Sequence, residues 1–340
     1  MSEMTHSEAL RGVIAGQDLT RDQAYRAFTQ IMDGAWTEAQ IAGLLVALAA
    51  KGETVDEIAG AGCAMREHAV KIDAGGADVL DTCGTGGTGL NTFNVSTAVA
   101  LVAAGAGVKV AKHGNRTSTR ASGSADVLAA LGVNIDAGPQ TVSRCLAEAG
   151  LCFCYAVRHH PAMKYAAPVR KALGVRTIFN LLGPLTNPAG AKHQLMGVFD
   201  GDRIEQIANV LGALGAVHAM VVHADDGLDE ISTVSQTAIA ELKDGKVRTR
   251  RVNPEDFGLD RAKMDDLLID SAGKSASVIR EVLSGKPGPK RDIVVLNAAA
   301  ALAVADRAES IAGGIPPAQQ AIDSGAASAV LERLIALSNR

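Results

Sequence analysis

Val79-Leu80-Asp81-Thr82-Cys83-Gly84-Thr85-Gly86-Gly87-Thr88-Gly89 is the stretch that decides the fold of this chain. Residues 79–81 are typical of a short buried strand, and a glycine-rich loop follows them. Residues 95–104 have the pattern of a helix, and residues 108–111 that of a second strand. A strand, a helix and a strand in this order form a unit whose two strands lie parallel. The sequence therefore predicts an α/β fold with a central, mainly parallel sheet.

Similar patterns continue through the rest of the chain. Helices are expected at 125–131, 140–150, 203–214 and 326–337, and strands at 194–199, 219–223 and 293–296. Two further strands, 239–242 and 247–252, are joined through Asp244-Gly245, which is typical of a tight hairpin turn. Residues 178–188 are expected to form a turn-rich apolar connector. These elements place residues 73–340 in one large α/β domain.

Residues 1–72 carry helical signals and no strand signal. Thr20, Thr37 and Thr54 are each followed three residues later by Gln or Glu, the pattern of a capping box at a helix start. Apolar residues between positions 41 and 49 repeat at helical spacing. The sequence therefore predicts a small helical domain at residues 1–72, with a role in packing or dimerisation.

Composition limits the function classes. The 340 residues suit about two domains. A net charge of −4 argues against a protein that coats nucleic acid, and no stretch approaches the roughly 20 apolar residues of a membrane span. Polar residues follow Met1, so no signal peptide is expected and the chain is predicted to be cytoplasmic. In that reduced setting Cys63, Cys83, Cys145, Cys152 and Cys154 are expected to be structural thiols.

Lys112-His113-Gly114-Asn115-Arg116 follows the second predicted strand. Ligands of α/β proteins collect at the carboxyl ends of parallel strands. A cationic segment at that place, continued by the hydroxyl-rich residues 117–124, is typical of a site for an anionic ligand. A solvated basic loop is the alternative.

Gly84-x-Gly86-x-x-Gly89 formally matches a dinucleotide-binding fingerprint. Such a site needs an acidic residue about 20 positions on, to bind the ribose hydroxyls. This chain has Lys112 at the end of the next strand, and a cation there suits phosphate instead. The glycine loop is therefore expected to surround phosphate oxygens with backbone N–H groups, as half of a two-phosphate site.

Three other segments are candidates. Asn94-Val95-Ser96-Thr97 begins the next helix, where its side chains cap the helix, contact the ligand, or do both. Asp229-Glu230 follows a strand and suits Mg²⁺ beside a polyphosphate, although paired acids on a surface turn are common. Arg170 is a candidate for binding a substrate carboxylate, or an ordinary surface residue at a helix end.

Together these residues resemble a known family. The motifs Gly84-Thr-Gly-Gly87, Asn94-Val-Ser-Thr97, Lys112-His-Gly-Asn-Arg116, His160-Pro-Ala-Met163, 180–188 and Asp229-Glu-Ile-Ser232 occur in one order along nearly the whole chain. That order is similar to the anthranilate phosphoribosyltransferases of tryptophan biosynthesis. The resemblance implies that anthranilate and 5-phosphoribosyl 1-pyrophosphate (PRPP) react with Mg²⁺ to release pyrophosphate. It also implies a homodimer formed through the helical domain, which part of residues 162–190 completes.

The resemblance also assigns residues to the two substrates and the metal. PRPP is expected at Gly84, Gly87, Thr88, Thr92, Asn94, Val95, Ser96, Thr97, Lys112, His113, Gly114, Asn115, Arg116, Thr117, Ser118, Thr119, Arg120 and Ser124. Anthranilate is expected at Gly84, His113, Asn115, His160 and Arg170. The metal is expected at Ser96, Asp229 and Glu230, and no residue is assigned as a catalytic acid or base.

Two positions depart from the family pattern. Thr88 stands where the family usually has Asp, which predicts weaker affinity for magnesium or for the donor. Val157-Arg158 stands where Pro and a small residue are more usual, and Arg158 is expected to add a cation near the acceptor. The related nucleoside phosphorylases would want a Lys-His-Ser-Thr-Gly-Gly type of loop, which this chain lacks at Lys112.

Overall fold

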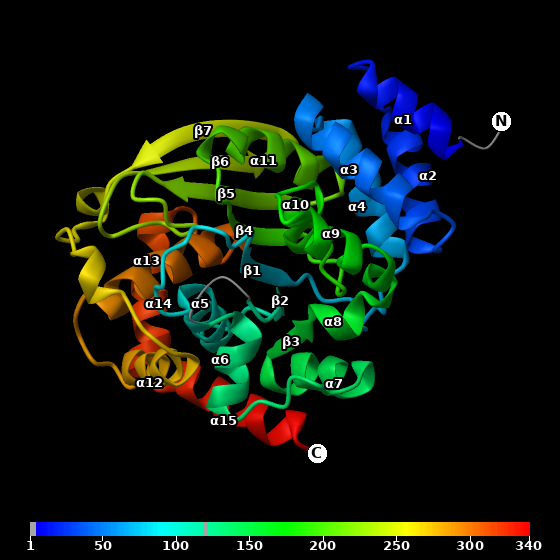
Figure 1. Cartoon of the computed structure of the whole chain (residues 1–340). Coiled ribbons are helices and arrows are strands. Elements are labelled where there is room, and N and C mark those ends of the chain that lie inside the picture. The colour runs from blue at the N-terminus through cyan, green and yellow to red at the C-terminus, as the bar shows by residue number, and fades with distance from the viewer. Residues whose placement is uncertain (1–4, 118–121) are drawn as a thin grey trace.

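The computed structural model describes residues 5–117 and 122–340. In the described chain seven strands form one sheet in the order β3-β2-β1-β4-β5-β6-β7 (Figure 1). Strands β1 to β5 are parallel, and β6 and β7 add an antiparallel hairpin at one edge. Their bounds are Leu80–Gly84, Val110–Gly114, Leu151–Tyr155, His193–Gly197, His218–Ala224, Thr237–Lys243 and Lys246–Val252. The predicted α/β class is confirmed.

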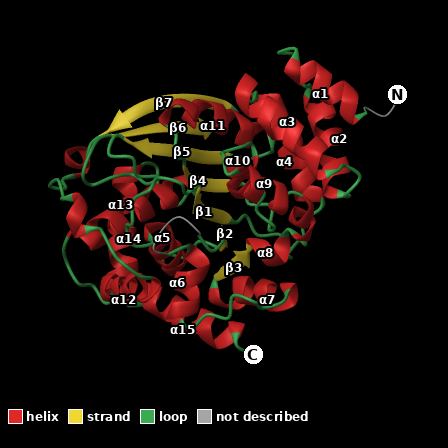
Figure 2. Cartoon of the chain, in the orientation of Figure 1, coloured by secondary structure: helices red, strands yellow, loops and turns green. Residues whose placement is uncertain are grey.

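Alternate residues of the strands face two separate cores, because successive side chains of a strand point to opposite faces. Met220 and Val222 of β5 lie in one core, beneath α5 (Val95–Gly105) and α13 (Pro289–Val304). Ala219 and Val221 lie in the other core, beneath α11 (Ile204–Ala213). Figure 2 shows the resulting layer of strands between helices. The first core also contains α6 (Ser124–Leu131), α7 (Pro139–Ala149), α12 (Ala272–Leu283), α14 (Ile311–Asp323) and α15 (Ala326–Ser338).

The N-terminal helices are α1 (His6–Ile14), α2 (Arg21–Met32), α3 (Glu38–Lys51) and α4 (Val55–Glu67). All three predicted capping boxes are present, and Thr5 with Glu8 adds a fourth at α1. The core of this bundle continues into α9 (Ala167–Leu173) and α10 (Phe179–Leu185), which contact α3 and α4 respectively. The division into 1–72 and 73–340, with part of 162–190 completing the helical domain, stays a prediction that this packing supports.

Several local predictions need correction. Residues 293–296 lie inside the buried helix α13 and are not a strand, since a short apolar run has no period that separates the two. Strand β3, which contains Cys152 and Cys154, was not predicted. The expected connector at 178–188 contains α10. Strand β2 extends to Gly114, so Lys112 and His113 belong to the strand and do not follow it.

Other local predictions hold. Asp244 and Gly245 both have positive φ, 53° and 70°, as the tight turn between β6 and β7 requires. Cys83, Cys145, Cys152 and Cys154 are buried free thiols, and Cys63 is half-buried. Among the described residues, no helix combines the length and the apolar character that crossing a membrane requires.

Candidate active site

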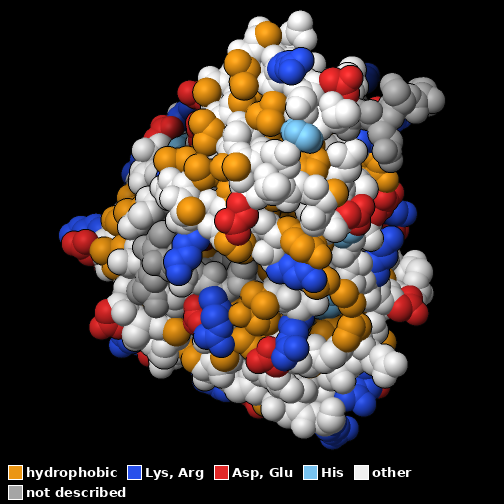
Figure 3. All heavy atoms as spheres, turned by 45° about the vertical axis from the view of Figure 1, so that its right-hand side comes forward, with side chains coloured by type: hydrophobic (Ala, Val, Ile, Leu, Met, Phe, Trp, Pro, Cys, Tyr) orange, Lys and Arg blue, Asp and Glu red, His pale blue; other side chains and the backbone are white. Residues whose placement is uncertain are grey.

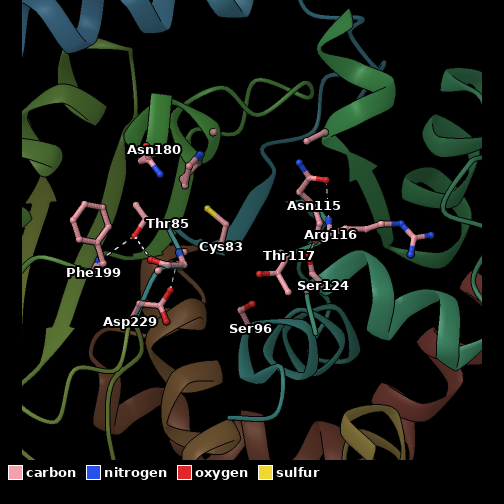
Figure 4. Close-up of a pocket in the computed structure, with 18 of the residues that line it drawn as sticks. Cys83, Thr85, Ser96, Asn115, Arg116, Thr117, Ser124, Asn180, Phe199 and Asp229 are labelled. Atoms are coloured by element: carbon pink, nitrogen blue, oxygen red, sulfur yellow. Dashed lines mark hydrogen bonds between the residues drawn. The ribbon is translucent and has the colours of Figure 1, made fainter. Parts of the chain in front are cut away.

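A cavity of about 620 Å³ opens at the carboxyl ends of β1 and β2 (Figure 4). It lies between the glycine loop, the end of β2, the segment that joins α9 to α10, and the loop after β5. The predicted residues that line it are Gly84, Gly87, Thr92, Asn94, Ser96, Lys112, His113, Gly114, Asn115, Arg116, Thr117, Ser124, Arg170, Asp229 and Glu230. Segments far apart in the sequence therefore meet at one site. Ser118, Thr119 and Arg120 lie outside the described residues.

The glycine loop is held closely against Asp229. The Gly86 N–H donates to Asp229 Oδ2 at 3.1 Å. A Cβ atom added at Gly84 would come within 2.5 Å of the same oxygen, so only glycine allows this approach. Gly86, Gly87 and Gly89 all have φ between 64° and 81°, the left-handed region that favours glycine. The loop can thus bring its backbone close to a ligand and to Asp229 together.

Lys112 is fully buried at the floor of the cavity. Its Nζ donates to the Thr82 carbonyl at 2.5 Å and to Ser96 Oγ at 3.0 Å. Burial lowers the pKa of Lys112, while the nearby Asp81 carboxyl opposes that change. The ammonium is therefore placed beside Ser96 by its surroundings before any ligand arrives.

Asp81 was not predicted as part of the site, yet it positions the end of β2. Its Oδ1 accepts from the His113 N–H at 3.0 Å, and its Oδ2 accepts from Asn187 Nδ2 at 2.8 Å. Burial raises the pKa of Asp81 to about 6, and Asn187 and Lys112 act against that rise. No local sequence signal separated Asp81 from an ordinary strand residue.

The second loop carries Asn115, Arg116 and Thr117 on the opposite side of the cavity from Asp229 and Thr85 (Figure 4). Arg116 forms an ion pair with Asp126 at 2.7 Å. A Cβ atom at Gly114 would meet Ser124 Oγ at 2.0 Å, which explains the glycine between the strand and the loop. The buried Ser122 hydroxyl also lines the cavity and has no hydrogen-bond partner among the described residues.

The residues of the Asn94–Thr97 segment differ in whether they cap the helix or line the cavity. Asn94 Oδ1 accepts from the Thr97 N–H at 3.1 Å and from its hydroxyl at 2.5 Å, so Asn94 caps α5. Asn94 and Ser96 also line the cavity, whereas Val95 and Thr97 are buried outside it. Thr88 is not among the lining residues, and its Oγ1 accepts from the Leu90 N–H at 3.3 Å.

The predicted acceptor side contains a buried pair of histidines. His113 Nε2 and His160 Nε2 are 3.2 Å apart, and only His113 reaches the cavity wall. Burial lowers the pKa of His113 well below its ordinary value and lowers that of His160 to about 4. The pair is therefore uncharged at neutral pH.

Arg170 lines the cavity with its guanidinium 5.6 Å from the centre of the Phe179 ring. Burial lowers its pKa, and no carboxylate among the described residues forms an ion pair with it. Arg170 is half-buried on the cavity wall, which supports the prediction that it binds a ligand. Arg158 does not add a cation here, because it pairs with Asp136 at 3.0 Å and does not line the cavity. The prediction for Arg158 needs that correction.

Asp229 and Glu230 supply carboxylates to the cavity, and Asp229 is 7% exposed. Among residues 5–117 and 122–340, no three His, Cys, Asp or Glu side chains form a cluster suited to hold a metal ion. Mg²⁺ commonly takes one or two carboxylates and completes its shell with water and substrate phosphate, so this donor set fits it. Ser96 fits less simply, since its hydroxyl accepts from Lys112.

The chain matches two family models. Residues 76–328 match the glycosyl transferase family a/b domain, and residues 7–69 match the helical bundle domain of that family. The anthranilate phosphoribosyltransferase of Symbiobacterium thermophilum is 54% identical over 331 residues, 97% of each chain. That of Thioalkalivibrio sulfidiphilus is 51% identical over 335 residues, 98% of this chain and 99% of its relative.

Solved structures agree with these relatives. Anthranilate phosphoribosyltransferase from Thermus thermophilus superposes with a TM-score of 0.93 at 41% identity, covering 98% of this chain and 99% of the other. The enzyme from Saccharomyces cerevisiae in complex with PRPP and Mg gives a TM-score of 0.88 at 27% identity, covering 99% of both chains. A further Saccharomyces cerevisiae structure, in complex with 4-fluoroanthranilate, gives a TM-score of 0.88 at 26% identity. The match covers 99% of this chain and 98% of the other.

Proposed function

The chain belongs to the anthranilate phosphoribosyltransferase family, and from this premise we propose that it transfers the phosphoribosyl group of PRPP to anthranilate in tryptophan biosynthesis. The observation that carries the proposal is that the glycine loop, the Lys112–Thr117 segment and Arg170 line one cavity. A substrate with two separate phosphate groups needs two such segments. A carboxylate-bearing acceptor needs a cation apart from them.

On the donor side, the glycine loop and the start of α5 offer backbone N–H groups and hydroxyls to phosphate oxygens. Lys112, Asn115 and Arg116 add charge and hydrogen bonds from the end of β2 and the loop after it. Ser118, Thr119 and Arg120 are proposed to extend this side. Val95 and Thr97 are proposed to act by shaping the start of α5, since their side chains lie outside the cavity.

Asp229 and Glu230 are proposed to hold Mg²⁺ on the pyrophosphate side of the donor. The ion would supply positive charge against the leaving pyrophosphate. Asp229 Oδ2 already accepts from the Gly86 N–H, which keeps this carboxylate next to the glycine loop. The second carboxylate and the substrate phosphates can then complete the oxygen shell.

On the acceptor side, Arg170 is proposed to bind the anthranilate carboxylate, with Asn115 and the His113–His160 pair beside the ring. The aromatic amine is unprotonated at pH 7, so it needs no strong base to attack. Neutral histidines suit this surface, because they present no charge to the ring or to the oxocarbenium-like centre. Catalysis then depends on positioning the amine and on stabilising the charge of the leaving group.

The direct test is loss of anthranilate fluorescence on incubation with the purified protein, PRPP and Mg²⁺. We expect turnover that stops when PRPP is omitted and when EDTA removes the metal. A matched pair of variants, Asp229→Asn and Asp225→Asn, separates the cavity carboxylate from a nearby surface one that pairs with Arg251. Absence of turnover with every aminobenzoate in the wild-type protein would refute the proposed reaction.

A further inference from the structure

Arg176 joins two parts of the site that are distant in the sequence. It lies in the short segment between α9 and α10, which packs with the helical bundle. Its Nη2 donates to the carbonyl of Gly87 in the glycine loop at 3.0 Å. Its guanidinium also lies 4.0 Å from the centre of the Phe199 ring, just after β4. One side chain thus links the helical part of the molecule to the glycine loop.

The charge of Arg176 has no acidic counterpart among the described residues. Arg170 shares this feature, whereas two other cations of the cavity differ, since Arg116 pairs with Asp126 and Lys112 has the Asp81 carboxyl nearby. Arg176 instead meets a backbone oxygen and an aromatic face, which are both weaker attractions than a carboxylate. These contacts therefore suit a residue that stabilises the backbone conformation of the glycine loop.

The glycine loop needs such a contact. Gly86, Gly87 and Gly89 have positive φ, and a loop of this composition has many accessible backbone conformations. A trans peptide points its C=O and its N–H in opposite directions. By holding the carbonyl of Gly87, Arg176 therefore also fixes the direction of the next N–H in the chain.

The loop has other anchors on different sides. Asp229 Oδ2 accepts from the Gly86 N–H at 3.1 Å. Thr85 Oγ1 accepts from the Phe199 N–H at 3.0 Å, which is visible as a dashed line in Figure 4. Phe199 is thus tied to the loop through its backbone and to Arg176 through its ring. Asp229 is one of the proposed metal ligands, so its carboxylate would bind both the loop and the ion. Arg176 has no such second role.

We propose that Arg176 is a positioning residue for the donor, which keeps the Gly84–Gly89 loop in the shape that receives the pyrophosphate. The identity of the donor in this proposal rests on the proposed function. The positioning role itself rests on the contact between Arg176 and Gly87. It assigns a role in donor binding to the segment that follows α9, the helix whose Arg170 is proposed to serve the acceptor.

The test compares Arg176→Ala and Arg176→Lys with Lys171→Ala, which removes an exposed cation of the neighbouring helix α9 that does not line the cavity. Hydrogen exchange of the ligand-free proteins is measured in peptides that cover residues 84–92. KM for PRPP, KM for anthranilate and kcat are then measured. For Arg176→Ala we expect faster exchange in the loop and roughly a tenfold rise in KM for PRPP. We expect KM for anthranilate and kcat to change by less than about twofold.

Arg176→Lys keeps the charge but loses the planar group that stacks on Phe199, so most of both defects should remain. Recovery of KM by lysine while loop exchange stays fast would assign Arg176 to a direct charge contact and overturn the positioning role. Unchanged loop exchange in Arg176→Ala would overturn it as well. The exchange measurement needs no substrate, so it decides the role of Arg176 even if the wild-type protein fails to turn over anthranilate.

Discussion

Acceptor recognition depends on Arg170 in the proposed reaction. Its guanidinium lies half-buried beside Phe179 with no ion-pair partner among the described residues, so its hydrogen-bond donors are available to a ligand. Arg170→Ala should raise KM for anthranilate about 10- to 150-fold, the loss of a hydrogen bond to a charged group of about 1.5–3 kcal/mol. Steady-state kinetics check this. PRPP binding, measured by calorimetry, should stay within about twofold of wild type, and a matching loss of PRPP affinity would contradict the assignment.

Thr88 is one of the two places where the family resemblance implies a departure from the usual pattern. Its Oγ1 accepts from the Leu90 N–H, so it helps shape the end of the glycine loop. Thr88→Asp adds a carboxylate to the loop that contacts Asp229 and should lower the Mg²⁺ concentration for half-maximal activity by roughly fivefold, about 1 kcal/mol. Thr88→Asn is the control of similar size without the charge. If both variants reach half-maximal activity at the same Mg²⁺ concentration and show the same KM for PRPP, the prediction that the missing carboxylate weakens affinity is refuted.

At the scale of elements, the β5–β6 pair contains a buried histidine between two carboxylates. His218 bonds Glu241 at 3.0 Å and Asp306 at 2.9 Å, which ties the sheet edge to the end of α13. The hydrogen bond from His218, together with Arg250, lowers the pKa of Glu241 against the opposing effect of burial. A carboxyl with a depressed pKa in the folded state stabilises it above its ordinary pKa of 4.5, and that stabilisation is lost as the pH falls below this value.

Glu241→Gln should therefore reduce the free energy of unfolding at pH 7 by about 1–2 kcal/mol. The difference from wild type should shrink as the pH falls below 4.5, the ordinary pKa of this carboxyl. Urea unfolding at pH 7 and at a pH below 4.5 measures the difference in the free energy of unfolding. Glu255→Gln, which removes an exposed carboxylate paired with Arg261, should show no measurable loss at either pH. An equal loss for Glu241→Gln at the two pH values would contradict the electrostatic origin.

The elements themselves were predicted to different degrees, for physical reasons. Helix starts at Thr20, Thr37 and Thr54 were predictable because a capping box is a local pattern. The apolar run at 293–296 predicts a strand, but a helix buried on all sides has the same run, and the structure has a helix there. Strand β3 was missed for a related reason, since its five residues are all buried and show no alternation.

Site residues were predictable from the sequence where they belong to contiguous motifs. Lys112, Asn115 and Asp229 were found because charge and glycine cluster beside strand ends. Asp81 and Arg176 were not found, because their roles depend on partners 32 and 89 positions away in the chain. Such pairs form only when the sheet register and the α9–α10 segment are in place.

At the scale of the whole molecule, the N-terminal bundle leaves apolar side chains uncovered. Ile14 is 72% exposed and Val46 is 45% exposed. Figure 3 shows hydrophobic side chains gathered over the upper part of the face, where these helices lie. Contiguous apolar surface on a folded domain favours association, and a second copy of the bundle is the partner that the family resemblance implies.

We therefore expect a homodimer formed through the helical domain, and a charge placed on α3 should weaken it. Val46→Glu should leave the monomer folded, because the side chain is half exposed, and should shift the molar mass measured by light scattering toward the monomer. Val217→Glu is the matched control, since Val217 is 52% exposed in the α/β domain between α11 and β5. A monomeric wild-type protein would contradict the dimer. A dimer that both variants leave intact would place the interface away from Val46, because burying an unpaired carboxylate against a second copy carries a large free-energy penalty.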